Sequence, residues 1–512
     1  MGTEYIFIPN SWIYFVGIKG TGVCALAELM HNAGIKVSGS DIPEVFYTDA
    51  ILDALKIPYH TEFDASHITD KISMVIYSAA YSAESNPELA KAQELKIPVL
   101  KYSDALGTWS ARFDSTGVCG VHGKTTTTAI CGVLMKAAGL PAQVLAGSAA
   151  FDFAQDAAPQ MAKQQGSAGS KSTLSLGGKY FIAETCEYRK HFLSFCPKRI
   201  ILTAVESDHQ DYFPDYESIR NAFVEYCRLL PYGGQLIYCA DDPGASEVAR
   251  IIESDNRMID IIPYGFTAPG DFKINSYKVE NERTIFSVAG FPREIKLRVP
   301  GRHEALNTAA ALALTASLIK NEKTELSGKQ IDSIVNALES FKSTKRRSEI
   351  IGEECGIIFM DDYGHHPTAI KTTLSGIKSF YPSRRLVVSF MSHTYTRTSA
   401  LLKEFSECFN EADIIFLHKI YASARENYSG GVNGRTLYEK TSAVRLAISH
   451  EKETFYTDEP DSAFKPLCKM LKPGDIFLTL GAGNNWPLGV KLLEHFKTAK
   501  NNAAAETKEA LT

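Results

Sequence analysis

The chain has 512 residues, of which 45% are hydrophobic and 22% charged, a balance typical of a globular protein with roughly two to four domains. Its formal net charge of −5 offers no broad basic surface, and no apolar run approaches the roughly 18 residues of a membrane helix. We therefore expect neither a nucleic-acid nor a membrane partner. The 10 cysteines form no Cys-x-x-Cys pair, and the start of the chain lacks a basic, apolar leader. Both features predict reduced, buried thiols in a cytoplasmic protein.

Residues 1–112 are predicted to form a Rossmann-like α/β domain. A strand at 13–16 leads into a glycine turn at 17–22, a helix follows over 23–32, and the next strand ends at Asp41. The glycines are spaced G-x-x-G-x-G, whereas the dinucleotide fingerprint is G-x-G-x-x-G. This spacing argues against an NAD-dependent oxidoreductase, although the helix N-terminus still suits a pyrophosphate.

The strongest signal lies at the start of the second predicted domain, residues 113–342. Gly120, Gly123, Lys124 and Thr125 form G-x-x-G-K-T directly before a predicted helix. Such a turn points backbone N–H groups at phosphate oxygens. Lys124 can then reach the β- and γ-phosphates, and the Thr125 hydroxyl can hold Mg²⁺. The motif is shorter than the usual G-x-x-x-x-G-K-[ST], because Val118 stands where the first glycine would be. It predicts an ATP-binding domain.

Polar groups follow the later strands of this second domain. Residues 148–178, rich in Ala, Gln, Ser and Gly, are expected to be a surface loop or an insertion. Beyond them, Glu184 and His209 each follow a predicted strand. Since the carboxyl ends of parallel strands meet at one edge of a sheet, these groups suit one or two Mg²⁺ ions on bound phosphates.

The third predicted domain, residues 343–498, is a second Rossmann-like unit with a parallel sheet. Its strands are expected at 356–360, 385–390, 413–417 and 475–480. The polar run 361–368 follows the first of these strands directly, and Pro367 fits the first turn of a helix. Residues 499–512, rich in Ala, Lys, Asn and Glu, are predicted to be a disordered tail.

In this order, the motifs resemble the Mur ligase family of peptidoglycan synthesis over nearly the whole chain. The matching segments are 17–22 with 37–41, 78–80 with 86–88, 122–128, 186–193, 208–209, 300–303 with Asn307, 361–368 and 395–398. The resemblance implies an α/β fold with a UDP-sugar-binding first domain, an ATP-binding second domain and an amino-acid-binding third domain. The chain departs from the family pattern at Tyr102, Glu304, Ala369 and Thr394, where Arg, Asn, Glu and Arg are common.

The resemblance also implies the site residues. The UDP-sugar would be bound by Gly17, Gly20, Gly22, Asp41, Ser78 and Asn86. ATP would be bound by Gly120, His122, Gly123, Lys124, Thr125, Thr126, His303, Asn307, Arg347 and Asp361. Mg²⁺ would be held by Thr125, Glu184 and His209. The catalytic set would be Lys124, His209, His365 and Arg397, the last two orienting or deprotonating the amino acid and holding its carboxylate.

The activity that the resemblance implies is the ATP-dependent joining of L-alanine to the carboxylate of UDP-N-acetylmuramate, through an acyl phosphate, by a monomer or homodimer. Two alternatives stay open. One is a sister activity that adds a recycled peptide to the same UDP-sugar, because pocket size is not readable from sequence. The other is a non-catalytic UDP-sugar sensor, which the retention of Lys124, Glu184 and His209 opposes.

Overall fold

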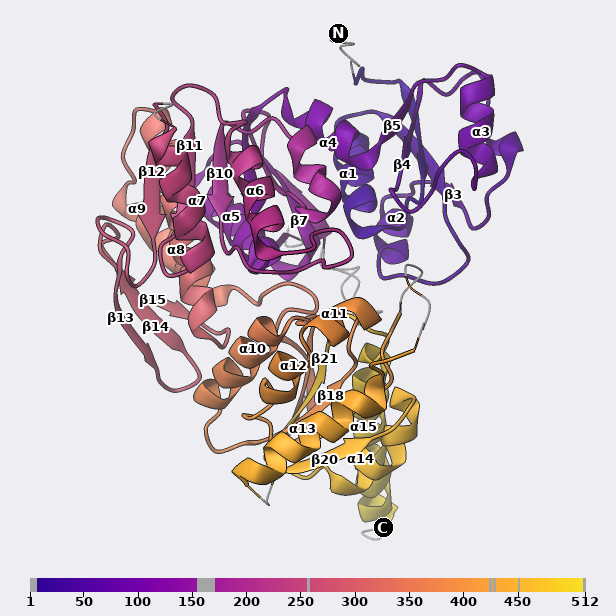
Figure 1. Ribbon diagram of the computed structural model, residues 1–512, viewed down its shortest axis with the longest axis vertical. Coiled ribbons are helices and arrows are strands. Elements are labelled where there is room, and N and C mark those ends of the chain that lie inside the picture. Colours follow the sequence, from indigo (N-terminus) through magenta and orange to yellow (C-terminus); the bar gives the residue numbers. More distant parts are fainter. Residues whose placement is uncertain are drawn as a thin grey trace.

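The computed structural model describes residues 7–153, 171–255, 258–422, 426, 430–449 and 452–509, and these form three α/β domains in chain order (Figure 1). The fold class predicted from the sequence is confirmed. Within the described ranges, no helix is both long and apolar enough to span a bilayer.

The first domain is built on a parallel sheet with the order β3-β2-β1-β4-β5. Its strands are β1 (Trp12–Val16), β2 (Lys36–Ser40), β3 (Tyr59–His60), β4 (Met74–Tyr77) and β5 (Val99–Lys101). Its helices are α1 (Thr21–Asn32), α2 (Asp49–Ala54), a 3₁₀ turn (Ala65–His67), α3 (Pro87–Glu94) and α4 (Tyr102–Ser110). The predicted strand–turn–helix start is confirmed, and Gly34, at φ +80°, ends α1 as expected of a glycine past a helix C-terminus.

The second domain carries a seven-stranded sheet with the order β12-β11-β10-β6-β9-β7-β8. Its strands are β6 (Asp114–Cys119), β7 (Ala142–Ala150), β8 (Lys171–Ser175), β9 (Tyr180–Glu184), β10 (Arg199–Leu202), β11 (Gln235–Cys239) and β12 (Asp260–Tyr264). Its helices are α5 (Lys124–Ala138), α6 (Tyr216–Cys227), α7 (Pro243–Ser254), α8 (Arg302–Asn321) and α9 (Gly328–Ser340), with 3₁₀ turns at Phe151–Phe153 and Tyr188–Ser194. A small antiparallel sheet is added by β13 (Ile274–Val279), β14 (Thr284–Val288) and β15 (Ile295–Leu297).

The loop expected at 148–178 is partly wrong. Ser148 to Ala150 complete β7, and β8 returns antiparallel beside it, while residues 154–170 lie outside the described part of the chain. These strand segments were not predicted, because alanine, serine and glycine have little strand propensity of their own. The side chains of Ala149, Ala150, Ser172 and Thr173 are instead buried against neighbouring elements.

The third domain has the strand order β16-β17-β21-β18-β19-β20, with β16 antiparallel at one edge. Its strands are β16 (Glu349–Glu354), β17 (Ile357–Asp362), β18 (Arg385–Phe390), β19 (Ile414–Leu417), β20 (Glu453–Tyr456) and β21 (Asp475–Leu480). Its helices are α10 (Pro367–Phe380), α11 (Tyr395–Ala400), α12 (Leu402–Glu407), α13 (Gly434–Ile448), a 3₁₀ turn (Pro460–Ala463), α14 (Phe464–Met470) and α15 (Trp486–Glu509). The disordered tail predicted from residue 499 is wrong for the backbone up to Glu509, because this Ala-, Lys- and Glu-rich stretch has high helix propensity and continues α15.

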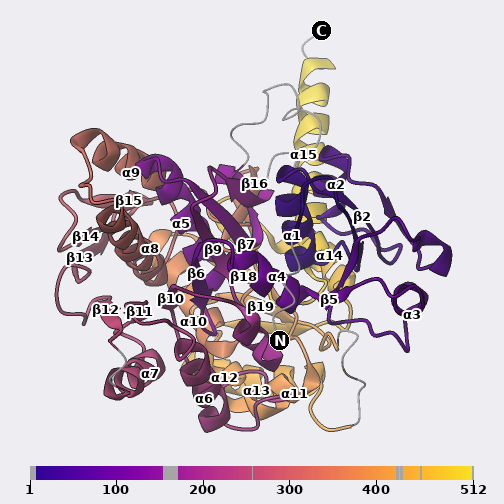
Figure 2. The ribbon, with the colours of Figure 1, turned by 90° about the horizontal axis from the view of Figure 1, so that it is seen from above.

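The first two domains share a hydrophobic core. One cluster of buried side chains runs from Phe15 and Leu26 of the first domain to Phe181 and Phe223 of the second. Figures 1 and 2 both show α1 and α4 of the first domain beside β7 of the second. The third domain has its own clusters and lies across the carboxyl ends of the second domain's strands. The predicted site residues therefore come from loops at which the three domains meet.

Candidate active site

The glycine turn before α5 has the geometry of a phosphate-binding loop. Gly120 has φ +130° and Gly123 has φ +80°, values that favour glycine. A Cβ at Gly120 would lie 2.2 Å from Thr203 Oγ1, and one at Gly123 would lie 2.8 Å from Asn307 Oδ1. Both positions therefore require glycine, and the turn directs the N-terminus of α5 toward the centre of the molecule.

Lys124 lies against a buried carboxylate that sequence reasoning left out of the site. Its Nζ donates to Glu187 Oε2 at 2.9 Å, to Glu187 Oε1 at 3.1 Å and to the Gly120 carbonyl at 2.5 Å. Burial alone would lower the pKa of Lys124, but the Glu187 and Glu184 carboxylates outweigh burial and raise it. Lys124 is thus charged and lies beside the turn. A bound phosphate could replace the Glu187 carboxylate as its ion-pair partner.

The predicted magnesium ligands Thr125 and Glu184 are brought together. Thr125 Oγ1 donates to Glu184 Oε2 at 2.8 Å, and the Gly147 N–H donates to the same oxygen at 2.9 Å. A hydroxyl and a half-exposed carboxylate at a helix N-terminus are the hard oxygen donors that Mg²⁺ takes alongside water and phosphate. The residues therefore fit this ion.

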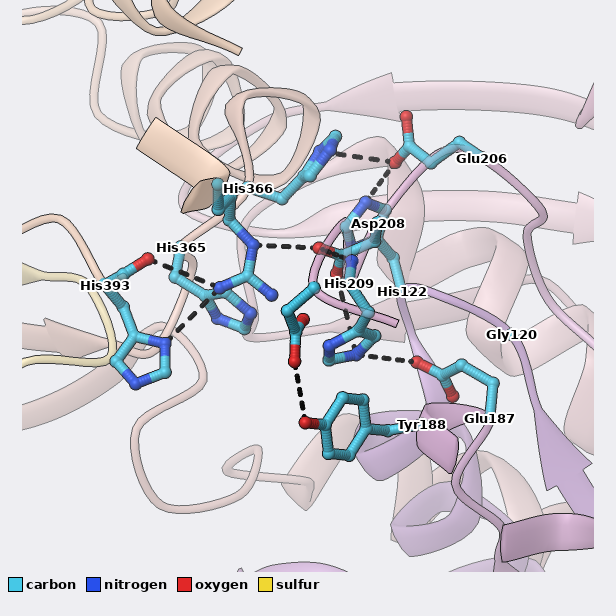
Figure 3. A network of polar contacts seen from close by, with 12 residues as sticks. Gly120, His122, Glu187, Tyr188, Glu206, Asp208, His209, His365, His366 and His393 are labelled. Atoms are coloured by element: carbon cyan, nitrogen blue, oxygen red, sulfur yellow. Dashed lines mark hydrogen bonds and ion pairs between the residues drawn. The ribbon is translucent and has the colours of Figure 1, made fainter. Parts of the chain in front are cut away.

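His209, the third predicted ligand, lies beside Glu187. His209 Nε2 is 3.5 Å from Glu187 Oε1, and the ring packs on Tyr188 with centroids 4.8 Å apart (Figure 3). Its backbone has φ +55°, and its N–H donates to Asp208 Oδ1 at 2.7 Å. His209 is thus held beside Glu187, the carboxylate that pairs with Lys124. A second cation site there would adjoin the Thr125–Glu184 site.

Arg397 of α11 crosses from the third domain to the second. Its Nε donates to Asp208 Oδ1 at 2.8 Å, both side chains are buried, and its Nη1 lies 3.3 Å from His393 Nδ1 (Figure 3). Burial would raise the pKa of Asp208, but the Arg397 guanidinium outweighs burial and holds it well below its usual range. The pair therefore stays ionised and joins the two domains.

His365 stands beside this pair as a neutral imidazole. Burial and the nearby Arg397 lower its pKa well below the usual range, and its Nδ1 lies 3.0 Å from the Tyr363 carbonyl. A neutral imidazole in this place can accept a proton. The predicted grouping of His365 with Arg397 is found in the structure.

Two residues predicted to bind ATP, His303 and Asn307, join Glu304 in a chain of polar contacts at the start of α8. Asn307 Oδ1 accepts from Thr127 Oγ1 at 3.1 Å, and Asn307 Nδ2 donates to Glu304 Oε2 at 3.2 Å. Glu304 Oε1 in turn lies 3.3 Å from His303 Nε2 and raises the pKa of that histidine against the effect of burial. Glu304, which departs from the family pattern, is therefore part of this network, and Asn307 links the network to Thr127 of α5.

The structure pairs Asp361 with Arg346, whereas the adjacent Arg347 is the arginine predicted to bind ATP. Arg346 Nε donates to Asp361 Oδ2 at 2.8 Å and Nη2 donates to the Gly481 carbonyl at 2.8 Å. The Arg347 guanidinium instead lies 5.4 Å from the centre of the Tyr363 ring. Arg346 lies in the turn before β16 with a φ of +60°, so no strand alternation indicates which arginine faces Asp361.

The predicted UDP-sugar residues gather at the strand ends of the first domain. Asp41 Oδ2 accepts the Lys19 N–H at 2.7 Å, and a Cβ at Gly17 would lie 2.8 Å from the Tyr81 ring. Asn86 uses its Oδ1 to cap α3, accepting from the Glu88 and Leu89 N–H groups. The remaining predicted residues are Gly20, which precedes α1, Gly22 in its first turn, and Ser78, which follows β4.

A cavity of about 190 Å³ joins the first domain to the phosphate site. Gly22 and Tyr102 line it from one side, and Glu184 and Cys186 line it from the other. A Cβ at Gly22 would lie 2.6 Å from the Tyr102 hydroxyl, so glycine leaves room for this ring. The cavity therefore lies between the first turn of α1 and Glu184, the hydrogen-bond partner of Thr125.

Three family models match the chain in the same order as its domains. They are "Mur ligase family, catalytic domain" at residues 12–114, "Mur ligase middle domain" at 118–315 and "Mur ligase, glutamate ligase domain" at 346–483. The chain belongs to the Mur ligase family. It is therefore an ATP-dependent ligase.

Curated Mur ligases resemble it over nearly their whole length. The UDP-N-acetylmuramate--L-alanine ligase of Treponema pallidum (strain Nichols) is 46% identical over 486 residues, which are 95% of this chain and 96% of that protein. The ligase of the same name from Borreliella burgdorferi is 38% identical over 483 residues, 93% of this chain and 97% of its own.

Solved Mur ligase structures share the fold. The UDP-N-acetylmuramate-alanine ligase of Thermotoga maritima aligns with a TM-score of 0.71 at 22% identity, covering 95% of this chain and 99% of that one. A murein peptide ligase from Psychrobacter arcticus aligns with a TM-score of 0.63 at 21% identity, covering 95% and 98%.

Sequence reasoning missed Glu187, Asp208 and Arg346 as site residues. Each stands next to, or within three positions of, a residue that was chosen, so the motifs located the segments but not the contacts. The signal that could have found Glu187 is its place in the matching segment 186–193, three residues after Glu184.

Proposed function

We propose that this Mur ligase joins L-alanine to the carboxylate of UDP-N-acetylmuramate, with ATP hydrolysed to ADP and phosphate. The observation that carries the proposal is the cavity between Gly22 and Glu184, which would bring the sugar's carboxylate to the phosphate loop. The names of relatives up to 46% identical over 95% of the chain support the choice of substrates. We further propose domain boundaries near 112/113 and 342/343, a monomer or homodimer, and a cytoplasmic site, where ATP is available.

The chemistry has to make a carboxylate electrophilic. A carboxylate oxygen attacks the γ-phosphorus of ATP, ADP leaves, and an acyl phosphate forms. The amine of alanine then attacks the acyl carbon, loses a proton, and expels phosphate. Catalysis of phosphoryl transfer rests mainly on positioning and on neutralising charge.

The second domain would perform the first step. We assign the β- and γ-phosphates to Lys124 and to the backbone N–H groups of the turn, with Lys124 released from Glu187. Thr125 and Glu184 would hold Mg²⁺, with His209 beside a second ion. The ion, when bound, would neutralise phosphate charge and draw electron density from the γ-phosphorus. His303, Asn307, Arg347 and Asp361 are proposed on the adenosine side of ATP.

The third domain would perform the second step. Arg397 keeps one edge of its guanidinium on Asp208 and can offer the other to the α-carboxylate of alanine. His365, neutral and a short distance away, can accept the proton that the amine loses. Because these groups come from a different domain than the phosphate loop, closure would assemble the site and exclude water from the acyl phosphate.

A phosphate-release assay with a panel of amine substrates tests this function. With UDP-N-acetylmuramate, ATP and Mg²⁺, we expect alanine to give the highest kcat/KM, and serine, glycine and a tripeptide to give lower values. A tripeptide preferred over alanine would favour the sister peptide-adding activity. Absence of phosphate release with every amine, from protein that still binds the UDP-sugar, would favour the sensor.

A further inference from the structure

Three metal-binding side chains from two domains converge beside the phosphate loop, apart from the Thr125–Glu184 pair. His122 lies in the loop itself, Glu206 follows β10 of the second domain, and His366 precedes α10 of the third. One ligand atom from each lies within 4.8 Å of the other two. Figure 3 shows both imidazoles turned toward the Glu206 carboxylate.

The contacts within this cluster orient all three groups. His122 Nε2 is hydrogen-bonded to Glu206 Oε1, and His366 Nδ1 lies 3.5 Å from the same oxygen. Thr368 Oγ1 donates to the other oxygen, Oε2, at 2.9 Å. His366 is 5% exposed, and its buried Nε2 has no hydrogen-bond partner among the described residues. Burial also lowers the pKa of His366, which favours the neutral imidazole that metals bind.

We propose that His122, Glu206 and His366 form a binding site for one transition-metal cation of the Zn²⁺ type, which links the second domain to the third. Two imidazoles and one carboxylate form a common Zn²⁺ donor set with a fourth position open, whereas Mg²⁺ prefers a shell made mainly of oxygen donors. In a tetrahedral site with bonds of about 2.0–2.2 Å, donors lie about 3.4 Å apart. The three ligand atoms lie within 4.8 Å of one another, which is close to this spacing. The Thr368 hydroxyl supplies the outer support that metal-bound carboxylates require.

The site has a consequence for turnover. His122 moves with the phosphate loop and His366 moves with the third domain, so a bound ion opposes their separation. Since substrates enter and products leave when the domains separate, we expect micromolar-range Zn²⁺ to slow turnover without displacing Mg²⁺.

Zn²⁺ binding to the full-length protein, measured by competition with a chromophoric chelator, tests the site. Saturating Mg²⁺ and ADP keep the Thr125–Glu184 position occupied, and binding by cysteines is the same in every variant. The variants are Glu206→Gln, which keeps the shape, and His366→Asn, which keeps a residue able to cap α10. His31→Asn, on α1 of the first domain, is the matched control.

We expect the wild type and His31→Asn to bind one Zn²⁺ that Glu206→Gln and His366→Asn bind at least about 10-fold more weakly. Inhibition of turnover by Zn²⁺ should weaken in parallel. Equal affinity and stoichiometry in the wild type and His366→Asn would overturn the proposal. If these two variants fail to fold, Thr368→Val serves instead, because it removes only the supporting hydroxyl. Unchanged affinity in Thr368→Val would then overturn it.

Discussion

At the residue scale, the central feature is the ion pair between Lys124 and Glu187. The Lys124 side chain is only 14% exposed, so its ammonium group is stabilised by an anion whether or not a nucleotide is bound. Glu187 supplies this anion at rest. Burial would raise the pKa of Glu187, but Lys124 and His209 outweigh burial and lower it. Phosphate oxygens would take over this role when ATP binds.

Lys124→Ala should lower turnover by on the order of 10²–10³, the typical loss for one electrostatic contact to a developing charge. Binding of UDP-N-acetylmuramate, measured by calorimetry, should stay near the wild-type value, because the first domain is untouched and the protein remains folded. Near-normal turnover in this folded variant would remove Lys124 from the phosphate site.

Arg397→Lys should raise the KM for alanine by about tenfold or more, while the KM for ATP changes little. Lysine keeps the charge and can still reach Asp208, but it loses the second edge of the guanidinium fork. One charge-assisted hydrogen bond is worth about 1.5–3 kcal/mol. If steady-state kinetics show an unchanged KM for alanine, Arg397 is a link between domains and its place at the carboxylate is wrong.

The residue types of the site could be predicted from sequence, but their pairings could not. The G-x-x-G-K-T turn identified Lys124 and Thr125 because helix N-termini and glycines impose one geometry. Nothing local identified Arg346 as the partner of Asp361, because both arginines lie in an irregular turn with positive φ at Ser343, Arg346 and Ser348.

At the element scale, the Glu184 carboxylate, which we propose as a Mg²⁺ ligand, is held by a backbone N–H group of the neighbouring strand β7. Gly147 of β7 donates its N–H to Glu184 at the end of β9, and a Cβ at Gly147 would lie 2.1 Å from Glu184 Oε2. A side chain there would displace the carboxylate from Thr125.

Gly147→Ala should therefore raise the Mg²⁺ concentration needed for half-maximal activity and lower kcat. Gly178→Ala is the matched control, because Gly178 lies in the turn before β9 with open space around its Cβ position. A Mg²⁺ titration of activity compares the two variants. An equal Mg²⁺ requirement in Gly147→Ala and Gly178→Ala would contradict a role for Glu184 in holding Mg²⁺.

The contact of α1 with β7 and β8 contains a second buried carboxylate. Glu28 of α1 is buried beside Thr173 and Lys171 of β8, and burial raises its pKa to about 7. The folded state therefore binds a proton that the unfolded state has lost, so this group's contribution to stability falls as pH rises from about 4.5 to about 7.

Glu28→Gln should remove this dependence. At pH 8 the variant should be more stable than the wild type, by up to about 3 kcal/mol, and at pH 5 the difference should be small. Thermal unfolding at the two pH values measures it. A variant less stable than the wild type at pH 8 would show that the ionised carboxylate stabilises this interface.

The predicted elements differ from the observed ones where tertiary contacts override local composition. The apolar parallel strands β9, β10, β18 and β21 were predicted nearly to their ends, because their side chains are buried on both faces. β8 was missed because its polar, small residues form a strand only against β7.

At the scale of the whole molecule, the three-domain order could be predicted because each domain has its own motif at a strand end. The joining of these ends could not, since it depends on the shared core of the first two domains and on Arg397 reaching Asp208. The cavity lined by Gly22 and Glu184 lies between the first domain's glycine turn and the second domain's strand ends. The proposed acyl-phosphate mechanism predicts that one carboxylate oxygen of the UDP-sugar is transferred to the released phosphate.

Oxygen transfer tests this claim most directly. UDP-N-acetylmuramate with both carboxylate oxygens replaced by ¹⁸O is incubated with the protein, alanine, ATP and Mg²⁺, and the released phosphate is analysed by mass spectrometry. Attack of the carboxylate on the γ-phosphorus predicts one ¹⁸O in each phosphate and one in the new amide. Unlabelled phosphate, released in step with the amide product, would contradict activation through an acyl phosphate.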